Sequence, residues 1–146
     1  MKSEREKIAE TFYQKAVESL KSAEQSLTSG NYRTACNRAY YATMQVIHAA
    51  AYLHLEDCPP TDPRWPNRVN WGHGEVKGLF NRVSNKLHQY RDNSTLSAKI
   101  PTLVRARYIA DYDSPEEGLN RKNAEEMVGI AKQIKKVLER NLVFSL

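Results

Sequence analysis

The sequence predicts an all-α fold, an antiparallel up-and-down bundle of four main helices with one shorter helix. Along five segments, apolar residues recur at spacings of three and four, which is the period of a helix that buries one face. No segment shows the strict alternation of apolar and polar residues between turns that is typical of β-strands. The chain has 146 residues, which suits one compact core, so a single domain over residues 1–146 is expected.

The first two predicted helices form a hairpin. The first runs from about Ser3 to Ser29, and Gly30 follows it in the position of a C-cap. The second continues to Leu55, and Asn31 is placed to cap its start. Two long helices joined by so short a turn must lie antiparallel.

A proline-rich segment from Asp57 to Gly74 follows the hairpin. Its prolines and turn-forming residues exclude regular structure. The segment is long for a connection inside a small domain, so it is either a functional loop or partly mobile. Trp65 and Trp71 are expected to anchor it against the bundle.

Three further helices are predicted, from about Glu75 to Tyr90, from near Ser97 to Tyr112, and from Arg121 to Leu142. The polar stretch RDNSTLSAK is expected to connect the third helix to the fourth. Pro101 is tolerable only in a first turn, which places the start of the fourth helix shortly before it. The stretch DSPEEGLNR is a second loop.

The bulk composition favours an intracellular protein with an acidic partner. The net charge is +5, which suits nucleic acid or a nucleotide, although a solvated basic surface is the plain alternative. No apolar run is long enough to span a membrane, and the polar N-terminus lacks the apolar core of a signal peptide. Cys36 and Cys58 have no metal or redox spacing, so a cytoplasmic location is expected.

Arg38 stands out because it lies in a helical segment that is apolar almost all round. A desolvated guanidinium costs several kcal/mol unless it is paired. One interpretation is an arginine that reaches to solvent from the edge of a face. The other is an ion pair with Asp111 of the predicted fourth helix, or a network that includes Arg107.

Three stretches, taken in order, resemble the HEPN domain family: GNYRTACNRAYYATMQVIHAAAYL, HGEVKGLFNRV and RARYIADYD. The resemblance extends over nearly the whole chain. It implies the helical bundle described above, a homodimer and a role connected with RNA or nucleotides. Many members are metal-independent ribonucleases, often toxins encoded beside a nucleotidyltransferase-like antitoxin.

The ribonuclease members carry an arginine, usually followed by a polar residue, and a histidine that four to six intervening residues separate from the arginine. In this chain the spacing occurs in RVSNKLHQY, with Arg82 and His88. His88 would act as general acid or base on a ribose 2′-hydroxyl, and Arg82 would hold the scissile phosphate. However, Val83 replaces the polar residue, and an ideal helix sets the two side chains about 120° apart.

The family's motif corresponds in position to RARYIADYD, where Arg107 precedes Asp111 and Tyr112 and no histidine follows. A carboxylate beside an arginine has a lowered pKa and supplies no proton near neutral pH. We therefore expect a HEPN protein that binds RNA or a nucleotide and lacks the standard catalytic pair. The alternatives are a ribonuclease that uses Arg82 and His88, and a protein-interaction module without affinity for nucleic acid.

The expected binding or structural network comprises Asn37, Arg38, Tyr41, His73, Arg107, Asp111 and Tyr112. Tyr90 and Tyr108 are candidates for stacking on bases. A basic surface that is equally consistent with solvated helix faces comprises Arg82, Lys86, Arg91, Arg105, Arg107, Arg121, Lys122, Lys132, Lys135, Lys136 and Arg140. No metal or cofactor is expected, because the histidines and cysteines lack ligand spacing. His48 and His54 are interpreted as packing or edge residues.

Overall fold

The computed structural model describes residues 1–56, 71–112 and 118–144. These ranges contain five α-helices, one short 3₁₀ turn and no strand, which confirms the all-α prediction. The elements are α1 (Glu4–Thr28), α2 (Tyr32–His54), η1 (His73–Glu75), α3 (Val76–Lys86), α4 (Tyr90–Tyr112) and α5 (Arg121–Glu139). None of these helices is both long and apolar enough to cross a membrane.

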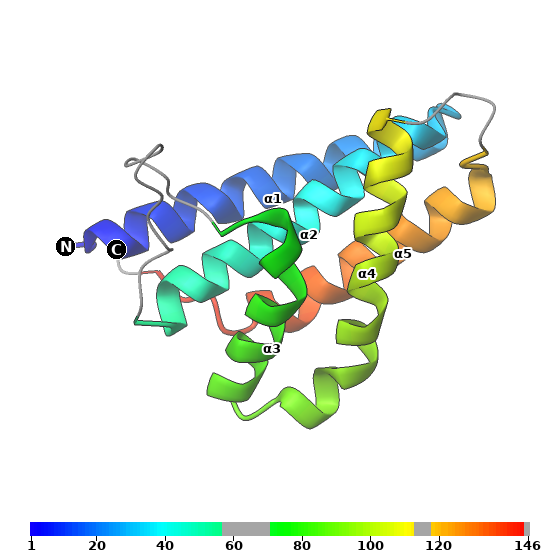
Figure 1. Ribbon diagram of the computed structural model, residues 1–146. Helices are drawn as coiled ribbons and strands as arrows, with labels where there is room; N and C mark the ends of the chain where they lie inside the picture. The colour runs from blue at the N-terminus through cyan, green and yellow to red at the C-terminus, as the bar shows by residue number, and fades with distance from the viewer. Residues whose placement is uncertain (57–70, 113–117, 145–146) are drawn as a thin grey trace.

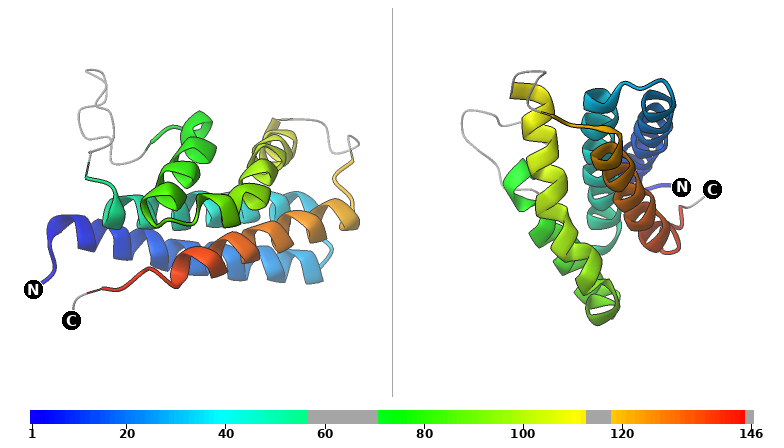
Figure 2. Two further views of the ribbon diagram at one scale, coloured as in Figure 1. Left: turned by 90° about the horizontal axis from the view of Figure 1, so that it is seen from below. Right: turned by 90° about the vertical axis from the view of Figure 1, so that its right-hand side faces the viewer.

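The helices are arranged in two layers. α1, α2 and α5 lie alongside one another, and α3 and α4 cross them on one face (Figures 1 and 2). α2 is the central element, because it contacts each of the other four α-helices. The segment that carries Arg38 is therefore surrounded by protein on most sides.

The core of α2 depends on small side chains. Its alanines are at most 1% exposed, so neighbouring helices approach its backbone closely. The alanines are Ala35, Ala39, Ala42, Ala49, Ala50 and Ala51. Larger side chains, among them Tyr40, Ile47 and Phe80, fill the remaining space. Any polar group of α2 that lies in this layer must find a hydrogen-bond partner.

The turn between α1 and α2 has the geometry that its glycine predicts. Gly30 has a φ of +81°, in the left-handed region. The Asn31 N–H donates to the Ser26 carbonyl at 2.8 Å, and the Gly30 N–H donates to the Leu27 carbonyl at 3.2 Å. This pair of bonds is the Schellman arrangement, which satisfies carbonyls that the helix end leaves open. Asn31 precedes α2 as predicted, but its side chain makes no capping bond.

Replacing Gly30 with alanine is expected to lower the free energy of unfolding by about 1 kcal/mol, because alanine is strained in the left-handed region. Gly78 of α3 is the matched control. It is exposed, and a Cβ placed there meets nothing within 4 Å. Gly78→Ala should therefore stabilise the protein by about 0.5–1 kcal/mol. Urea unfolding of both variants measures the difference, and equal shifts of the same sign would contradict this account of the turn.

The boundary between α3 and α4 differs from the prediction. α3 ends at Lys86 and not at Tyr90, because His88 adopts a left-handed φ of +58° and closes a second Schellman turn. α4 begins at Tyr90 and not near Ser97, so the stretch expected to be a polar connection is helical.

Polar contacts between the two helices explain that error. The Asn93 amide donates to the Ser84 hydroxyl at 3.1 Å, and the Ser97 hydroxyl donates to the Asn81 side chain. Asn93 and Ser97 are buried, as is Ser84 of α3, so polar side chains fill buried positions in the stretch that the sequence pattern assigned to a connection. Pro101 consequently lies inside α4, where it removes one backbone hydrogen bond. The axis of α4 bends in its first half (Figure 1).

Trp71 anchors the chain where the described structure resumes. Its side chain is 4% exposed and packs edge-on against His48 and Tyr52. Its backbone N–H donates to the Nε2 of His48 at 3.0 Å. The predicted anchoring role of Trp71 is confirmed, and that of Trp65 lies outside the described residues.

Candidate functional site

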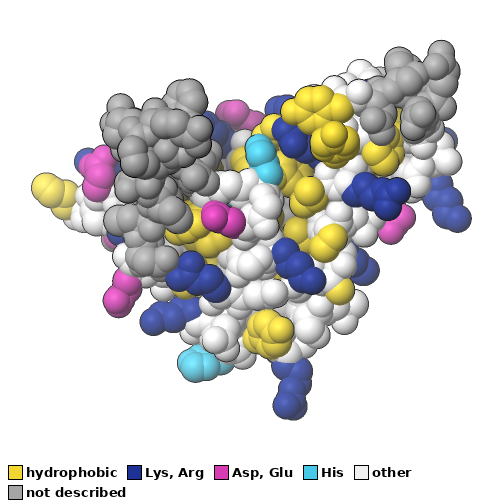
Figure 3. Space-filling model, in the orientation of Figure 1, with side chains coloured by type: hydrophobic (Ala, Val, Ile, Leu, Met, Phe, Trp, Pro, Cys, Tyr) yellow, Lys and Arg dark blue, Asp and Glu magenta, His cyan; other side chains and the backbone are white. Residues whose placement is uncertain are grey.

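The candidate site lies where α4 crosses the first half of α2, beside η1. We call it the arginine–tyrosine cluster, defined as Asn37, Arg38, Tyr40, Tyr41, His73, Arg107, Asp111 and Tyr112. Figure 1 shows the crossing of the two helices, and Figure 3 shows arginine or lysine side chains among hydrophobic ones on this face. The structure thus brings together all seven residues of the network expected from the sequence, and it adds Tyr40.

Arg107 is the centre of the cluster. Its Nε lies 3.0 Å from the Oδ2 of Asp111, one helical turn further on, and the two side chains are 15% and 23% exposed. The guanidinium carbon lies 5.6, 5.9 and 5.7 Å from the ring centres of Tyr40, Tyr41 and Tyr112. These distances are those of cation–π contacts, which hold the arginine in place and leave its charge at the surface of the cluster.

Arg107 forms an ion pair with Asp111, but the geometry of this pair does not meet the criteria of a hydrogen bond. Its Nε is buried and has no hydrogen-bond acceptor among the described residues. Its Nη2 donates only a long bond, 3.4 Å, to the Tyr41 hydroxyl. A ligand cannot reach the buried Nε, but the terminal nitrogens of the guanidinium retain much of their capacity to donate to an anion.

Asn37 is the hydrogen-bond partner of the Arg38 guanidinium. The Asn37 Oδ1 accepts from the Nε and Nη2 of Arg38 at 2.9 and 2.6 Å, and the Asn37 Nδ2 donates to Asp111 at 2.6 Å. Among the described residues, Arg38 thus reaches Asp111 through Asn37 and not by a direct ion pair. Consecutive residues of a helix are rotated by about 100°, so Asn37 and Arg38 leave α2 in different directions, and Asn37 is the one that contacts α4. The Arg38 guanidinium also lies 5.1 Å from the Tyr41 ring centre.

Tyr40 and His73 join α2 to η1. The Tyr40 hydroxyl hydrogen-bonds the Nδ1 of His73. Burial raises the pKa of Tyr40 to about 12, so the phenol keeps its proton. Burial, with a smaller contribution from the charge of Arg107, lowers the pKa of His73, so the imidazole is neutral near pH 7. Because the nitrogen is a better acceptor than the Met44 sulfur 3.9 Å away, Tyr40 donates to Nδ1 and the proton of His73 lies on Nε2.

Two exposed tyrosines border the cluster on α4. Tyr108 and Tyr112 are 58% and 65% exposed, and their ring centres lie 5.0 Å apart. Arg107 contacts the second of these rings. Aromatic faces that are open to solvent and next to a cation are suited to stacking on bases.

Sequence reasoning missed Arg33 and Tyr40. Arg33 donates from Nη2 to the backbone carbonyls of Ala110 and Ile109 at 2.6 and 3.3 Å, which places its charge at the C-terminal end of α4. It lies four residues before Asn37 on the same face of α2, and this spacing is the signal that could have found it. No pattern in the sequence indicates the pairing of Tyr40 with His73, because their elements are joined by a long segment.

Arg82 and His88 lie at the opposite end of α3 from His73 and outside the cluster. Both are exposed, and α3 ends between them. A cavity of about 380 Å³ is lined by Asn81, Arg82, Asn85 and Tyr90, and His88 is not among its lining residues. The two side chains proposed as a catalytic pair therefore do not line a shared cavity in the described part of the chain.

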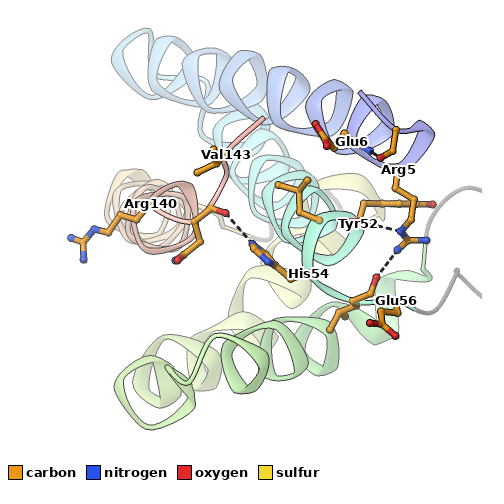
Figure 4. A pocket seen from close by; sticks show the side chains of 11 residues that line it. Arg5, Glu6, Tyr52, His54, Glu56, Arg140 and Val143 are labelled. Atoms are coloured by element: carbon orange, nitrogen blue, oxygen red, sulfur yellow. Dashed lines mark hydrogen bonds between the residues drawn. The ribbon is translucent and has the colours of Figure 1, made fainter. Parts of the chain in front are cut away.

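A separate cavity of about 730 Å³ lies where the start of α1 meets the end of α2 and the residues after α5 (Figure 4). Its basic side chains hold helix ends together. Arg5 donates to the carbonyls of Tyr52 and Leu55 at 3.2 and 2.7 Å, and the Nε2 of His54 bonds the Asn141 carbonyl at 2.9 Å. This cavity has no residue in common with the arginine–tyrosine cluster.

The family model of the HEPN domain matches residues 9–62. The match begins in α1 and includes all of α2, and thus Asn37, Arg38, Tyr40 and Tyr41 of the cluster. No curated protein and no solved structure matches the chain. Over these residues the chain is similar to HEPN domains, as the resemblance predicted, and its all-helical bundle is consistent with the HEPN fold.

Proposed function

We propose that the protein binds single-stranded RNA, or a nucleotide of the same chemistry, through the arginine–tyrosine cluster, and that it does not cleave it. The exposed Tyr108–Tyr112 pair beside Arg107 is the observation that carries this proposal. Stacking platforms next to cations are how proteins hold single strands without reading their sequence.

The charges of the cluster favour an anion. Arg107 pairs with the carboxylate of Asp111 and Arg38 is linked to the same carboxylate through Asn37, so two cations share one acidic group, and the net charge of the chain is +5. The Asn37 amide and the Tyr41 ring hold Arg38, and three tyrosine rings hold Arg107, so a phosphate would meet oriented donors.

The same geometry argues against cleavage at the cluster. Attack by a ribose 2′-hydroxyl needs a group that accepts its proton. The Nδ1 of His73 is occupied by Tyr40, and the carboxylate of Asp111 is held by Arg107 and Asn37. Neither group is free to act as a general base.

Tyr112→Ala is expected to weaken the binding of a fluorescein-labelled oligouridylate about tenfold, since one stacked base contributes roughly 1–3 kcal/mol. Tyr90→Ala is the matched control, because Tyr90 is also exposed, at 51%, but lies at the other end of α4. Fluorescence anisotropy measures both variants. Equal affinities of Tyr112→Ala and the wild type would contradict the stacking role.

The ribonuclease alternative is tested on the same RNA. After incubation in EDTA, a gel should show intact RNA for the wild type. Cleavage that disappears in His88→Ala would establish the alternative reaction at Arg82 and His88 and overturn the proposal that the protein only binds RNA.

The resemblance to HEPN proteins further suggests a homodimer, a nucleotidyltransferase-like partner in a toxin–antitoxin or defence locus, and a cytoplasmic location. These remain expectations, as does the single domain over residues 1–146. If the protein fails to bind RNA even at low salt, the interaction-module alternative replaces the binding proposal.

A further inference from the structure

A groove between the start of α3 and the middle of α4 has a different chemistry from the cluster beside it. We call it the α3–α4 groove. It encloses about 340 Å³ and is lined by His73, Lys77, Ile100, Pro101, Val104 and Arg105, with Gly74 at its edge. This volume falls in the lower part of the range of ligand sites in proteins. His73 also belongs to the arginine–tyrosine cluster, so the two surfaces adjoin.

The lining of the groove is aliphatic and its charged groups are basic. Pro101 and Val104 come from successive turns of α4 and supply its accessible apolar surface, while Ile100 also lines the groove but is only 1% exposed. Lys77 and Arg105 are exposed, and neither forms an ion pair or hydrogen bond within the described structure. Gly74 leaves further room, because a Cβ there would meet nothing within 4 Å.

We propose that the α3–α4 groove binds an acidic peptide segment of a partner protein. An aliphatic side chain of the segment lies on Pro101 and Val104, and carboxylates on either side pair with Lys77 and Arg105. Charge complementarity selects an acidic occupant, because no acidic side chain lines the groove among the residues that the structure describes. The aliphatic lining selects a peptide over a nucleobase, because bases are held by aromatic faces, and these lie in the neighbouring cluster.

The inference goes beyond RNA binding and does not depend on it. Because His73 lines both surfaces, a bound peptide would occupy space next to the proposed RNA site. A partner that carries such a segment would therefore compete with RNA for this face.

A model peptide tests the groove. The probe is a fluorescein-labelled dodecapeptide in which leucines alternate with pairs of glutamates, and its binding is measured by anisotropy without RNA. Two control peptides replace all glutamates with lysines, or all leucines with serines. The wild-type protein should bind the probe, and both control peptides should bind at least about tenfold more weakly, which corresponds to about 1.4 kcal/mol.

Protein variants separate the groove from overall charge. Lys77→Glu/Arg105→Glu should lose at least about tenfold in affinity for the probe. Lys122→Glu/Lys136→Glu changes the net charge equally at exposed positions of α5 and should bind like the wild type. Val104→Trp fills the groove and should also abolish binding, with circular dichroism and thermal unfolding as the checks that it folds.

Three outcomes would overturn the proposal. The first is no binding of the probe at millimolar concentration. The second is an equal loss in the two double charge reversals, which would reflect net charge alone. The third is a Val104→Trp variant that binds the peptide normally but has lost oligouridylate, which would assign the groove to nucleic acid.

Discussion

Arg107→Gln is expected to weaken RNA binding more than any other single substitution in the cluster. The substitution removes a cation that lies against three tyrosine rings, and it leaves the carboxylate of Asp111 without its ion-pair partner. A bond from a charged donor contributes about 1.5–3 kcal/mol, so a loss of roughly tenfold to a hundredfold is predicted. Anisotropy with the labelled oligouridylate measures it.

Two controls isolate this effect. Lys136→Gln removes the same charge from an exposed position of α5 and should change the affinity little. Arg107→Gln/Asp111→Asn removes the unpaired carboxylate as well, so part of the lost affinity should return. Equal losses in Arg107→Gln and Lys136→Gln would show that RNA responds only to the net charge of the protein.

The stability of the fold is expected to fall as the pH drops from 7 to 5, because of His48. This residue is fully buried, and its two partners determine its protonation. The Met44 carbonyl, 2.8 Å from Nδ1, can only accept, and the Trp71 N–H, 3.0 Å from Nε2, can only donate. The native ring therefore carries its proton on Nδ1 and has no room for a second one.

The sign of the pH effect follows from this arrangement. Burial is the main cause that lowers the pKa of His48, with a smaller lowering by His73, while the hydrogen bond to the Met44 carbonyl and the charge of Glu75 act in the opposite direction. The unfolded chain takes up a proton near pH 6.5, but the native chain does not. Stability is complete above that pH and is lost as the pH falls toward the lower native pKa, by up to about 1.4 kcal/mol per pH unit.

Urea unfolding at several pH values from 7 to 5 measures this loss. His48→Gln removes the titrating group, so its curve of unfolding free energy against pH should be flatter than that of the wild type. His54→Gln is the control, because His54 is only partly buried and its ring bonds a single carbonyl. If the wild type and His48→Gln lose stability in parallel, His48 is not the group responsible.

The helices could be predicted from the sequence because their apolar stripes have the correct period. The start of α4 could not be predicted in this way. Asn93 and Ser97 are polar residues, and their hydrogen bonds to α3 form only when the two helices pack together. The helical period is recognised from the spacing of apolar residues, so it does not reveal polar residues that are buried in pairs.

Part of the candidate site could also be predicted from the sequence pattern. Arg38, Arg107 and Asp111 are charged residues in apolar surroundings, which marks them without any structure. The bridge through Asn37 depends on the angle at which α4 crosses α2. The contact of Tyr40 with His73 depends on a long connection between their helices, and local sequence does not encode it.

The salt dependence of RNA binding tests the central claim, that oriented arginines of the cluster hold phosphate. The affinity for oligouridylate is measured at increasing salt for the wild type and for Arg38→Gln/Arg107→Gln. Each phosphate contact to a single strand adds about 0.7 to the slope of log affinity against log salt. The account predicts that the slope of the double variant is shallower by about 1.4. Parallel lines for the two proteins would contradict it.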